Sequence, residues 1–264
     1  MSEKLLSVEN LTMKFGGLIA IDDLSFSAMK DQITSIIGPN GAGKTTVFNC
    51  LTGFYKASSG SMFLNKDNKT LDLKKFSDFK VAQKAGVART FQNIRLFPQM
   101  SVLENMMVAQ HNKLMAASGF SLLGLINAPS FLRKEKEAKE ISKYWLDIIN
   151  LTNRADDNAG DLPYGDQRKL EIVRAMCIEP YLLCLDEPAA GLNAKESAEL
   201  NKLLKFIQKE KKTGILLIEH DMSVVMGISD HVVVLNYGKK IFEGTAQETK
   251  KSPEVIEAYL GTEE

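Results

Sequence analysis

One glycine-rich loop constrains this chain more than any other stretch, because it determines both a local fold and a chemistry. An apolar run at 33–37 precedes it and a helical segment beginning near residue 44 follows it, so we expect strand, loop and helix in that order. The loop matches G-x-x-x-x-G-K-[ST], whose backbone N–H groups and helix N-terminus bind phosphate. Lys44 is expected to reach the β- and γ-phosphates, and the Thr45 hydroxyl to ligate Mg²⁺. The predicted nucleotide-binding residues are Gly38, Pro39, Asn40, Gly41, Ala42, Gly43, Lys44, Thr45 and Thr46.

Length and composition set the outer limits. The 264 residues suit one large α/β domain or two small ones, and 44% hydrophobic with 25% charged residues is typical of a globular protein. The 33 basic and 33 acidic side chains balance, so overall charge gives no indication of nucleic-acid binding. No apolar run approaches the roughly 18 residues of a membrane span, and no signal-peptide pattern is present at the N-terminus. The three cysteines lack metal-site spacing and are expected to be buried, reduced thiols, as in the cytoplasm.

Hydrophobic periodicity predicts an α/β protein. Alternating residues indicate half-buried strands at 5–12 and 20–29, and unbroken apolar runs indicate fully buried strands at 181–185 and 214–218. Shorter strands are expected at 61–64 and 86–91, with a polar turn at 65–68 and a hairpin around Tyr237. From 98 to 178 the chain is mostly helical, and a capping box at 101–104 begins a helix. The further predicted helices are 73–85, 133–149, 166–178, 194–211 and one from Pro253, and 118–129 is expected to be a loop or short helix.

Polar side chains follow the predicted strands where those strands end. Because ligands bind at the carboxyl ends of parallel strands, Gln92, the pair Asp186 and Glu187, and His220 are expected to converge on one nucleotide. Asp186 is suited to hold Mg²⁺, and Glu187 to accept a proton from the attacking water; the alternative for Glu187 is a structural carboxylate. The other two histidines, His111 and His231, are interpreted as structural.

Two features bear on which base is bound. Phe15 precedes a Gly-Gly turn upstream of the phosphate loop, and an exposed aromatic ring there could stack on adenine, although a core phenylalanine is an equal alternative. The guanine-binding pattern Asn-Lys-x-Asp is nearly met at 65–68, but the last position is Asn68. These observations favour ATP over GTP.

The ordered set of motifs resembles the ATP-binding-cassette (ABC) ATPases over nearly the whole chain. The loop at 38–45 resembles Walker A, and 182–187 resembles Walker B with its catalytic glutamate. Gln92 resembles the Q-loop glutamine, which the resemblance makes a ligand of Mg²⁺ together with Thr45 and Asp186. His220 resembles the switch histidine, and Phe15 the adenine-stacking residue. The segment 162–166 resembles the signature motif, in which Gly165 contacts nucleotide.

The resemblance implies a fold: a mixed, largely parallel core sheet, an antiparallel β subdomain and an inserted helical subdomain. It predicts a single ABC ATPase domain, with 1–97 and 180–264 forming the nucleotide-binding core and 98–179 the helical signature subdomain. Four positions depart from the family pattern. Pro163, Tyr164 and Asp166 replace the serine, the first glycine and the glutamine of Leu-Ser-Gly-Gly-Gln, and Asn193 stands where the D-loop usually has aspartate.

A finer resemblance is to ATP-binding subunits of bacterial branched-chain amino acid importers, carried by the segments 162–168, 186–193, 218–222, 226–230 and 258–261. It implies an ATP-hydrolysing subunit on the cytoplasmic face of the inner membrane, acting with a second ABC ATPase subunit (identical or paralogous), transmembrane permease subunits and, indirectly, a substrate-binding protein. ATP and Mg²⁺ are the expected cofactors, and nucleic acid is not an expected partner. The surface near Arg95, Phe97, Pro98 and Met100 is the candidate permease contact, with a core role as the alternative.

Two alternatives belong to other classes. A soluble ABC ATPase acting on DNA would be expected to carry a long coiled coil between the phosphate loop and the signature, and that interval lacks sustained heptads. Ribosome-acting members usually carry two cassettes, whereas this chain has one. A small-molecule kinase with a phosphate loop would leave Gln92, His220 and the signature segment unexplained.

Overall fold

The computed structural model describes residues 3–77, 79–117 and 129–260, which form two compact units. Unit 1 comprises residues 1–92 and 180–264, and unit 2 comprises residues 93–179. The first boundary therefore follows Gln92 rather than residue 97.

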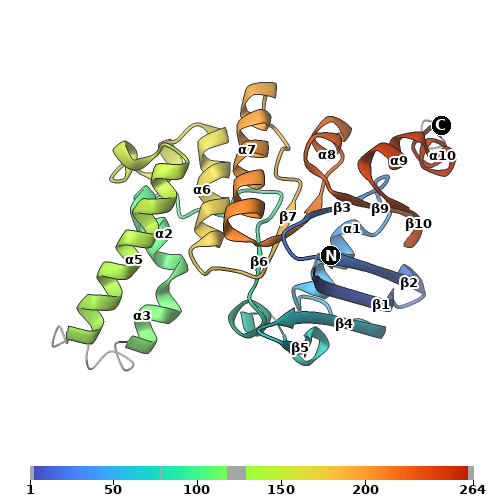
Figure 1. Cartoon of the computed structure of the whole chain (residues 1–264), viewed down its shortest axis with the longest axis horizontal. Coiled ribbons are helices and arrows are strands. Elements are labelled where there is room, and N and C mark those ends of the chain that lie inside the picture. Colours follow the sequence, from blue (N-terminus) through green and yellow to red (C-terminus); the bar gives the residue numbers. More distant parts are fainter. Residues whose placement is uncertain (1–2, 78, 118–128, 261–264) are drawn as a thin grey trace. The chain divides into compact units, whose positions relative to one another are not determined.

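Unit 1 is built on a six-stranded mixed sheet with the order β10-β9-β3-β8-β7-β6 (Figure 1). Neighbouring strands from β9 to β6 are parallel, and only the β9–β10 pair is antiparallel. Every residue of β3, β7 and β8 is buried, as expected for strands covered on both faces. The strands are β3 (Ile33–Ile37), β6 (Val87–Arg89), β7 (Leu182–Asp186), β8 (Gly214–Ile218), β9 (His231–Asn236) and β10 (Lys239–Gly244).

A second sheet in unit 1 is antiparallel, with the order β2-β1-β4-β5. Its strands are β1 (Lys4–Phe15), β2 (Leu18–Met29), β4 (Ser59–Lys66) and β5 (Lys69–Asp72). Helix α1 (Lys44–Leu51) lies between the two sheets, and one core cluster joins Phe26 of β2, Phe48 of α1 and Leu216 of β8. The predicted mixed core sheet and antiparallel β subdomain are confirmed, and this core anchors the helix that follows the phosphate loop.

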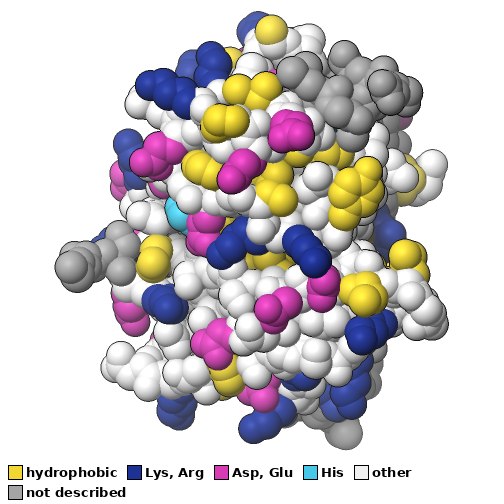
Figure 2. Space-filling view, turned by 90° about the vertical axis from the view of Figure 1, so that its right-hand side faces the viewer, with side chains coloured by type: hydrophobic (Ala, Val, Ile, Leu, Met, Phe, Trp, Pro, Cys, Tyr) yellow, Lys and Arg dark blue, Asp and Glu magenta, His cyan; other side chains and the backbone are white. Residues whose placement is uncertain are grey.

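Further helices of unit 1 are α7 (Ala194–Lys211), α8 (Met222–Ile228), α9 (Ala246–Lys251) and α10 (Pro253–Leu260). Helix α7 has its predicted bounds, because the Asn193 side chain accepts hydrogen bonds from the N–H groups of Lys195 and Glu196 and caps its start. The last helices pack on β9 through Val225, Val234 and Val255. Figure 2 shows the side of unit 1 at this end, where both signs of charge and hydrophobic side chains are interspersed.

Unit 2 is helical, as predicted. Its helices are α2 (Val102–Ala109), α3 (His111–Ala117), α5 (Pro129–Ile148) and α6 (Tyr164–Met176), with single turns at Thr152–Arg154 and Ala159–Asp161. The predicted capping box is present: the Ser101 hydroxyl accepts from Glu104 N, and the Glu104 carboxylate accepts from Ser101 N. The prediction for 118–129 lies outside the described residues except at Pro129, where α5 begins. None of the helices in the described ranges is both long and apolar enough to span a membrane.

The predicted helix at 73–85 is wrong. The segment begins with a 3-10 turn (Leu73–Lys75), capped by the Asp72 side chain, and Phe76 is extended. A short π-helix (Val81–Ala85) follows, and Gly86 ends it with a φ of +73°. Phe76 packs against the core of unit 1, so tertiary burial outweighs local helix propensity here.

Smaller differences concern strand ends. The turn predicted at 65–68 is narrower, because only Asp67 and Asn68 have positive φ and the residues beside them pair in β4 and β5, a strand not predicted. Strand β6 is shorter than the predicted 86–91, and α5 and α6 begin earlier than predicted. The three cysteines are buried and free, as predicted, and burial raises the pKa of the Cys184 thiol to about 12.

We expect Leu216→Ala to lower the free energy of unfolding by about 2–5 kcal/mol, because Leu216 is fully buried in the core between the sheets. Urea unfolding followed by circular dichroism measures the change. The exposed Leu18→Ala is the control and should shift stability by less than about 0.5 kcal/mol. Equal losses in the two variants would contradict this account of the core.

Candidate nucleotide-binding site

The predicted site residues of unit 1 follow four adjacent strands of the parallel part of the sheet. The phosphate loop follows β3, His220 comes shortly after β8, Glu187 comes directly after β7, and Gln92 follows β6. Parallel strands end at the same edge of a sheet, so the order β3-β8-β7-β6 brings these segments together.

The phosphate loop is held closely by neighbouring backbone. A Cβ at Gly38 would lie 2.1 Å from Leu235 O, and one at Gly43, whose φ is +98°, would lie 2.6 Å from Ile21 Cδ1. Only glycine fits at these two positions. Lys44 Nζ donates to Gly38 O at 2.7 Å and Pro39 O at 3.0 Å. Burial lowers the pKa of Lys44, an effect that Glu187 and Asp186 partly oppose.

A cavity of about 470 Å³ lies over this loop, within the size range of small-molecule sites. Phe15 lines it with a 42% exposed side chain, and its ring meets the Tyr55 ring edge-on at 5.2 Å between centroids. Phe15 is therefore a surface residue rather than a core phenylalanine. The other lining residues include loop residues 40–46, Glu187 and Tyr237.

Tyr237 was not among the predicted site residues. Its side chain is 82% exposed, and the neighbouring Gly238 N donates to Ala42 O at 3.1 Å, which ties the hairpin turn to the phosphate loop. In the sequence, Tyr237 is an aromatic residue at a predicted turn. Side chains at turns are usually solvated, so this position gave no reason to place it in the site. Only the β9–β3 pairing brings that turn to the loop.

Glu187 is the centre of the polar cluster. Gln92 Nε2 donates to Glu187 Oε2 at 2.9 Å, and His220 Nδ1 lies 3.4 Å from the same oxygen. The backbone of Glu187 has a φ of +47°, which is uncommon for a residue with a side chain and is often found at functional sites. All three residues predicted to be catalytic therefore meet at one carboxylate.

Asp186, the last residue of β7, is buried and pairs with Arg89, which sequence reasoning missed. Arg89 Nη2 donates to Asp186 Oδ2 at 2.9 Å, and Nη1 donates to Asn49 Oδ1 at 2.6 Å and Thr52 Oγ1 at 3.2 Å. The guanidinium thus links β7 to α1, the helix that begins in the phosphate loop. Its carbon also lies 4.9 Å from the centre of the Phe91 ring. A lone arginine in a short strand carries no sequence signal of this role.

The donor set fits Mg²⁺ only together with phosphate oxygens. Among residues 3–77, 79–117 and 129–260, no group of three or more His, Cys, Asp or Glu side chains could hold a metal. Mg²⁺ is typically bound by one or two carboxylates, waters and substrate phosphates. The Thr45 hydroxyl, the Gln92 amide oxygen and the Asp186 carboxylate are oxygen ligands of the right kind.

Gly165 belongs to unit 2, where it is buried in the first turn of α6. One departure from the family signature, Asp166, has a local partner. Lys169 Nζ lies 2.8 Å from Asp166 Oδ1, so the acidic charge at this helix start is paired. Gln167 Nε2 donates to Leu162 O at 2.7 Å and holds the segment before the helix.

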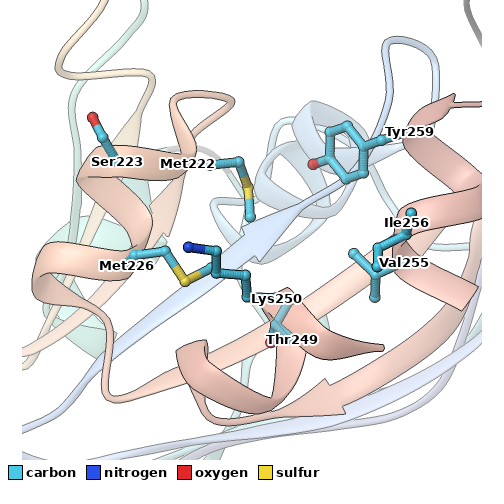
Figure 3. A pocket seen from close by; sticks show the side chains of 8 residues that line it. All are labelled: Met222, Ser223, Met226, Thr249, Lys250, Val255, Ile256 and Tyr259. Carbon is cyan, nitrogen blue, oxygen red and sulfur yellow. The ribbon is translucent and has the colours of Figure 1, made fainter. Parts of the chain in front are cut away.

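A second cavity in unit 1, of about 510 Å³, is separate in its lining from the phosphate loop (Figure 3). Its walls come from α8, α9 and α10, and they are mostly apolar. The lining residues are Met222, Ser223, Met226, Thr249, Lys250, Val255, Ile256 and Tyr259.

Comparisons with known proteins agree with this geometry. Residues 21–190 match the family model of the ABC transporter, and residues 239–264 match that of the branched-chain amino acid ATP-binding cassette transporter. The chain is 49% identical to the high-affinity branched-chain amino acid transport ATP-binding proteins BraF of Pseudomonas aeruginosa and LivG of Escherichia coli, over 99% of each chain. A solved ATP-binding cassette of an ABC transporter in its ADP conformation is 31% identical, with a TM-score of 0.82 over 98% of this chain and 100% of that one.

We expect Arg89→Ala to lower the free energy of unfolding by about 3–5 kcal/mol, because it leaves the buried Asp186 carboxylate unpaired. The double variant Arg89→Ala/Asp186→Ala should lose less than the sum of the single variants. Chemical unfolding of the variants measures both. The exposed pair of Lys134 and Glu137 is the control, and Lys134→Ala should change stability by less than about 1 kcal/mol. Additive losses at Arg89 and Asp186 would contradict the coupling.

Proposed function

This chain belongs to the ABC transporter family as an ATP-hydrolysing cassette, and on that premise we propose that it energises import of branched-chain or similar hydrophobic amino acids. The substrate class is supported by the 49% identical relatives and by the family model matched at 239–264. Uptake of labelled leucine, isoleucine and valine by cells with and without the gene tests it. Unchanged uptake of all three, with loss of another solute, would overturn the substrate class.

The observation that carries the proposed ATPase mechanism is the meeting of Gln92 and His220 on the Glu187 carboxylate, beside a phosphate loop that holds Lys44. In this proposal Glu187 accepts a proton from the attacking water, and Gln92 and His220 orient its carboxylate. Lys44 and the backbone N–H groups of 38–45 bind the phosphates. Mg²⁺, when bound, supplies positive charge to the β- and γ-phosphate oxygens.

Binding of the base is assigned to the exposed aromatic wall of the cavity. Phe15 stacks on adenine, and its edge-on contact with Tyr55 sets the orientation of its ring. The remaining loop residues that line the cavity, among them Asn40 and Thr46, contact the phosphates.

The partners follow from the transporter assignment. The family arrangement places the phosphate loop of one cassette against the signature segment of a second, so Gly165 would contact nucleotide bound to the partner cassette. Transmembrane permease subunits hold the pair at the cytoplasmic face of the membrane, and a binding protein delivers the amino acid. Membership of a transporter makes the chain membrane-associated through these subunits. The alternative of a soluble ATPase acting on DNA or ribosomes has no support among the curated relatives reported above.

A loop of unit 2 is suited to contact the permease. Phe97 is 48% exposed, yet its backbone is fixed: Phe97 N donates to Asn105 Oδ1 at 2.9 Å, and Asn105 Nδ2 donates to Phe97 O at 3.0 Å. Arg95 N likewise donates to the buried Glu171 carboxylate at 2.8 Å. An exposed aromatic ring on a rigid loop is a typical anchor at protein interfaces.

We expect Glu187→Gln to retain ATP binding and to lose turnover by a factor on the order of 10²–10⁴, because the general base is removed while the loop is untouched. Lys44→Ala is the contrasting variant and should lose ATP affinity. Calorimetric titration with ATP and phosphate release by the assembled transporter measure the two effects. Near-normal turnover in Glu187→Gln would reject its role, and unchanged ATP affinity in Lys44→Ala would reject the phosphate-loop assignment.

We expect Phe97→Ala to weaken co-purification of the permease subunits from detergent-solubilised membranes at least tenfold, with ATP affinity of the chain unchanged. Val108→Ala, at another exposed apolar side chain of unit 2, is the matched control and should co-purify normally. Equal recovery of permease with Phe97→Ala would remove this loop from the interface.

A further inference from the structure

A buried glutamate joins the loops that carry Glu187 and His220, and the mechanism above assigns it no role. Glu219 directly follows β8 and is fully buried. Its Oε1 accepts from Ala189 N at 2.8 Å, and its Oε2 accepts from His220 N at 3.2 Å and Asp221 N at 3.4 Å. One side chain therefore bonds the backbone of both loops.

The hydrogen bonds match a carboxylate and not merely a polar side chain. Each carboxylate oxygen receives backbone N–H groups, so both oxygens must be acceptors. Burial raises the pKa of Glu219, and the hydrogen bonds from the backbone N–H groups of Ala189, Asp221 and His220 offset only part of that rise. An ionised group this deeply buried is costly unless such donors surround it. The three backbone hydrogen bonds therefore offset part of the free-energy cost of burying the Glu219 carboxylate.

We propose that Glu219 is a positioning residue that keeps the loop of Glu187 in register with the loop of His220, so that their side chains meet. The inference deepens the proposed function and rests on it. A further hydrogen bond, from Glu187 N to Ile218 O at 2.9 Å, joins the same two segments. Together these contacts support the positive-φ backbone of Glu187, a conformation that persists only when its surroundings impose it.

The side chain also connects two stretches beyond the catalytic pair. Ala189 leads into the segment that ends at Asn193, the N-cap of α7, and Asp221 is the N-cap of α8. A displacement of the segment after Glu187 would therefore pull on the backbone of His220. Glu219 makes the two loops move as one body.

The test is the isosteric variant Glu219→Gln. An amide has one acceptor oxygen, so its NH₂ group must face either Ala189 N–H or the N–H groups of His220 and Asp221. We expect kcat for ATP hydrolysis by the assembled transporter to fall about 10- to 100-fold. The KM for ATP should stay unchanged, because the Glu219 oxygens bond the backbone at 189 and 220–221 and not the phosphate loop. Gln208→Ala is the control: it removes a buried side chain of unit 1 that bonds Asp31 O and Asp230, and kcat should be unaffected.

A double-mutant cycle separates positioning from general stability. If Glu219 acts through His220, then Glu219→Gln added to His220→Ala should cost little beyond His220→Ala alone. Fully additive losses, or a fall in ATP affinity equal to the fall in kcat, would overturn the proposal.

Backbone-amide hydrogen exchange of the full chain gives a readout that needs no turnover. In Glu219→Gln the amides at 189 or at 220–221 should exchange at least tenfold faster than in the wild type, with the phosphate loop unchanged. Unchanged exchange at both segments would refute the positioning role of Glu219 even if kcat fell. Absence of ATP hydrolysis in the wild type, with faster exchange in the variant, would instead reject the proposed function, while the link that Glu219 makes between the two loops would still be supported.

Discussion

The parallel pairing of β3, β8, β7 and β6 is the constraint on which the nucleotide site depends. Each strand places polar site residues at its carboxyl end, and hydrogen bonding between neighbouring strands fixes the spacing of those residues. The strands are buried on both faces, so their register cannot shift without exposing apolar side chains to water. The phosphate loop, His220, the Asp186–Glu187 pair and Gln92 are thereby held at one edge of the sheet, although they lie far apart in the sequence.

Buried charges then join these segments to one another. Arg89 ties Asp186 to the helix that begins in the phosphate loop, and Glu219 ties the segment after Glu187 to that of His220. Both charges are costly to bury and are stabilised by several hydrogen bonds each. The segment that carries Glu187 is therefore attached on both sides, to helix α1 and to the segment of His220.

In unit 2, buried polar side chains likewise hold a segment in place, here an exposed loop. The buried Asn105 and Glu171 bond the backbone of this loop, so that Phe97 is presented on a rigid support. At the start of α6, pairing of Asp166 with Lys169 shows how a departure from the usual signature is accommodated locally. The acidic side chain of Asp166 is therefore not an unpaired charge in the segment that carries Gly165.

The sequence by itself determined the features encoded by local chemistry: the phosphate loop, the buried strands, the capping box at Ser101, and the residues placed at strand ends. These depend on spacing and side-chain type within a few residues. Only the tertiary structure decided that 73–85 is not a continuous helix, because Phe76 packs into a core formed by distant residues. It alone also identified Arg89, Glu219 and Tyr237, because Asp186, Ala189 and the phosphate loop, which they respectively meet, lie far from them in the chain. Their roles depend on contacts with distant residues, and an isolated charged or aromatic residue looks the same in a sequence whether it is solvated or buried.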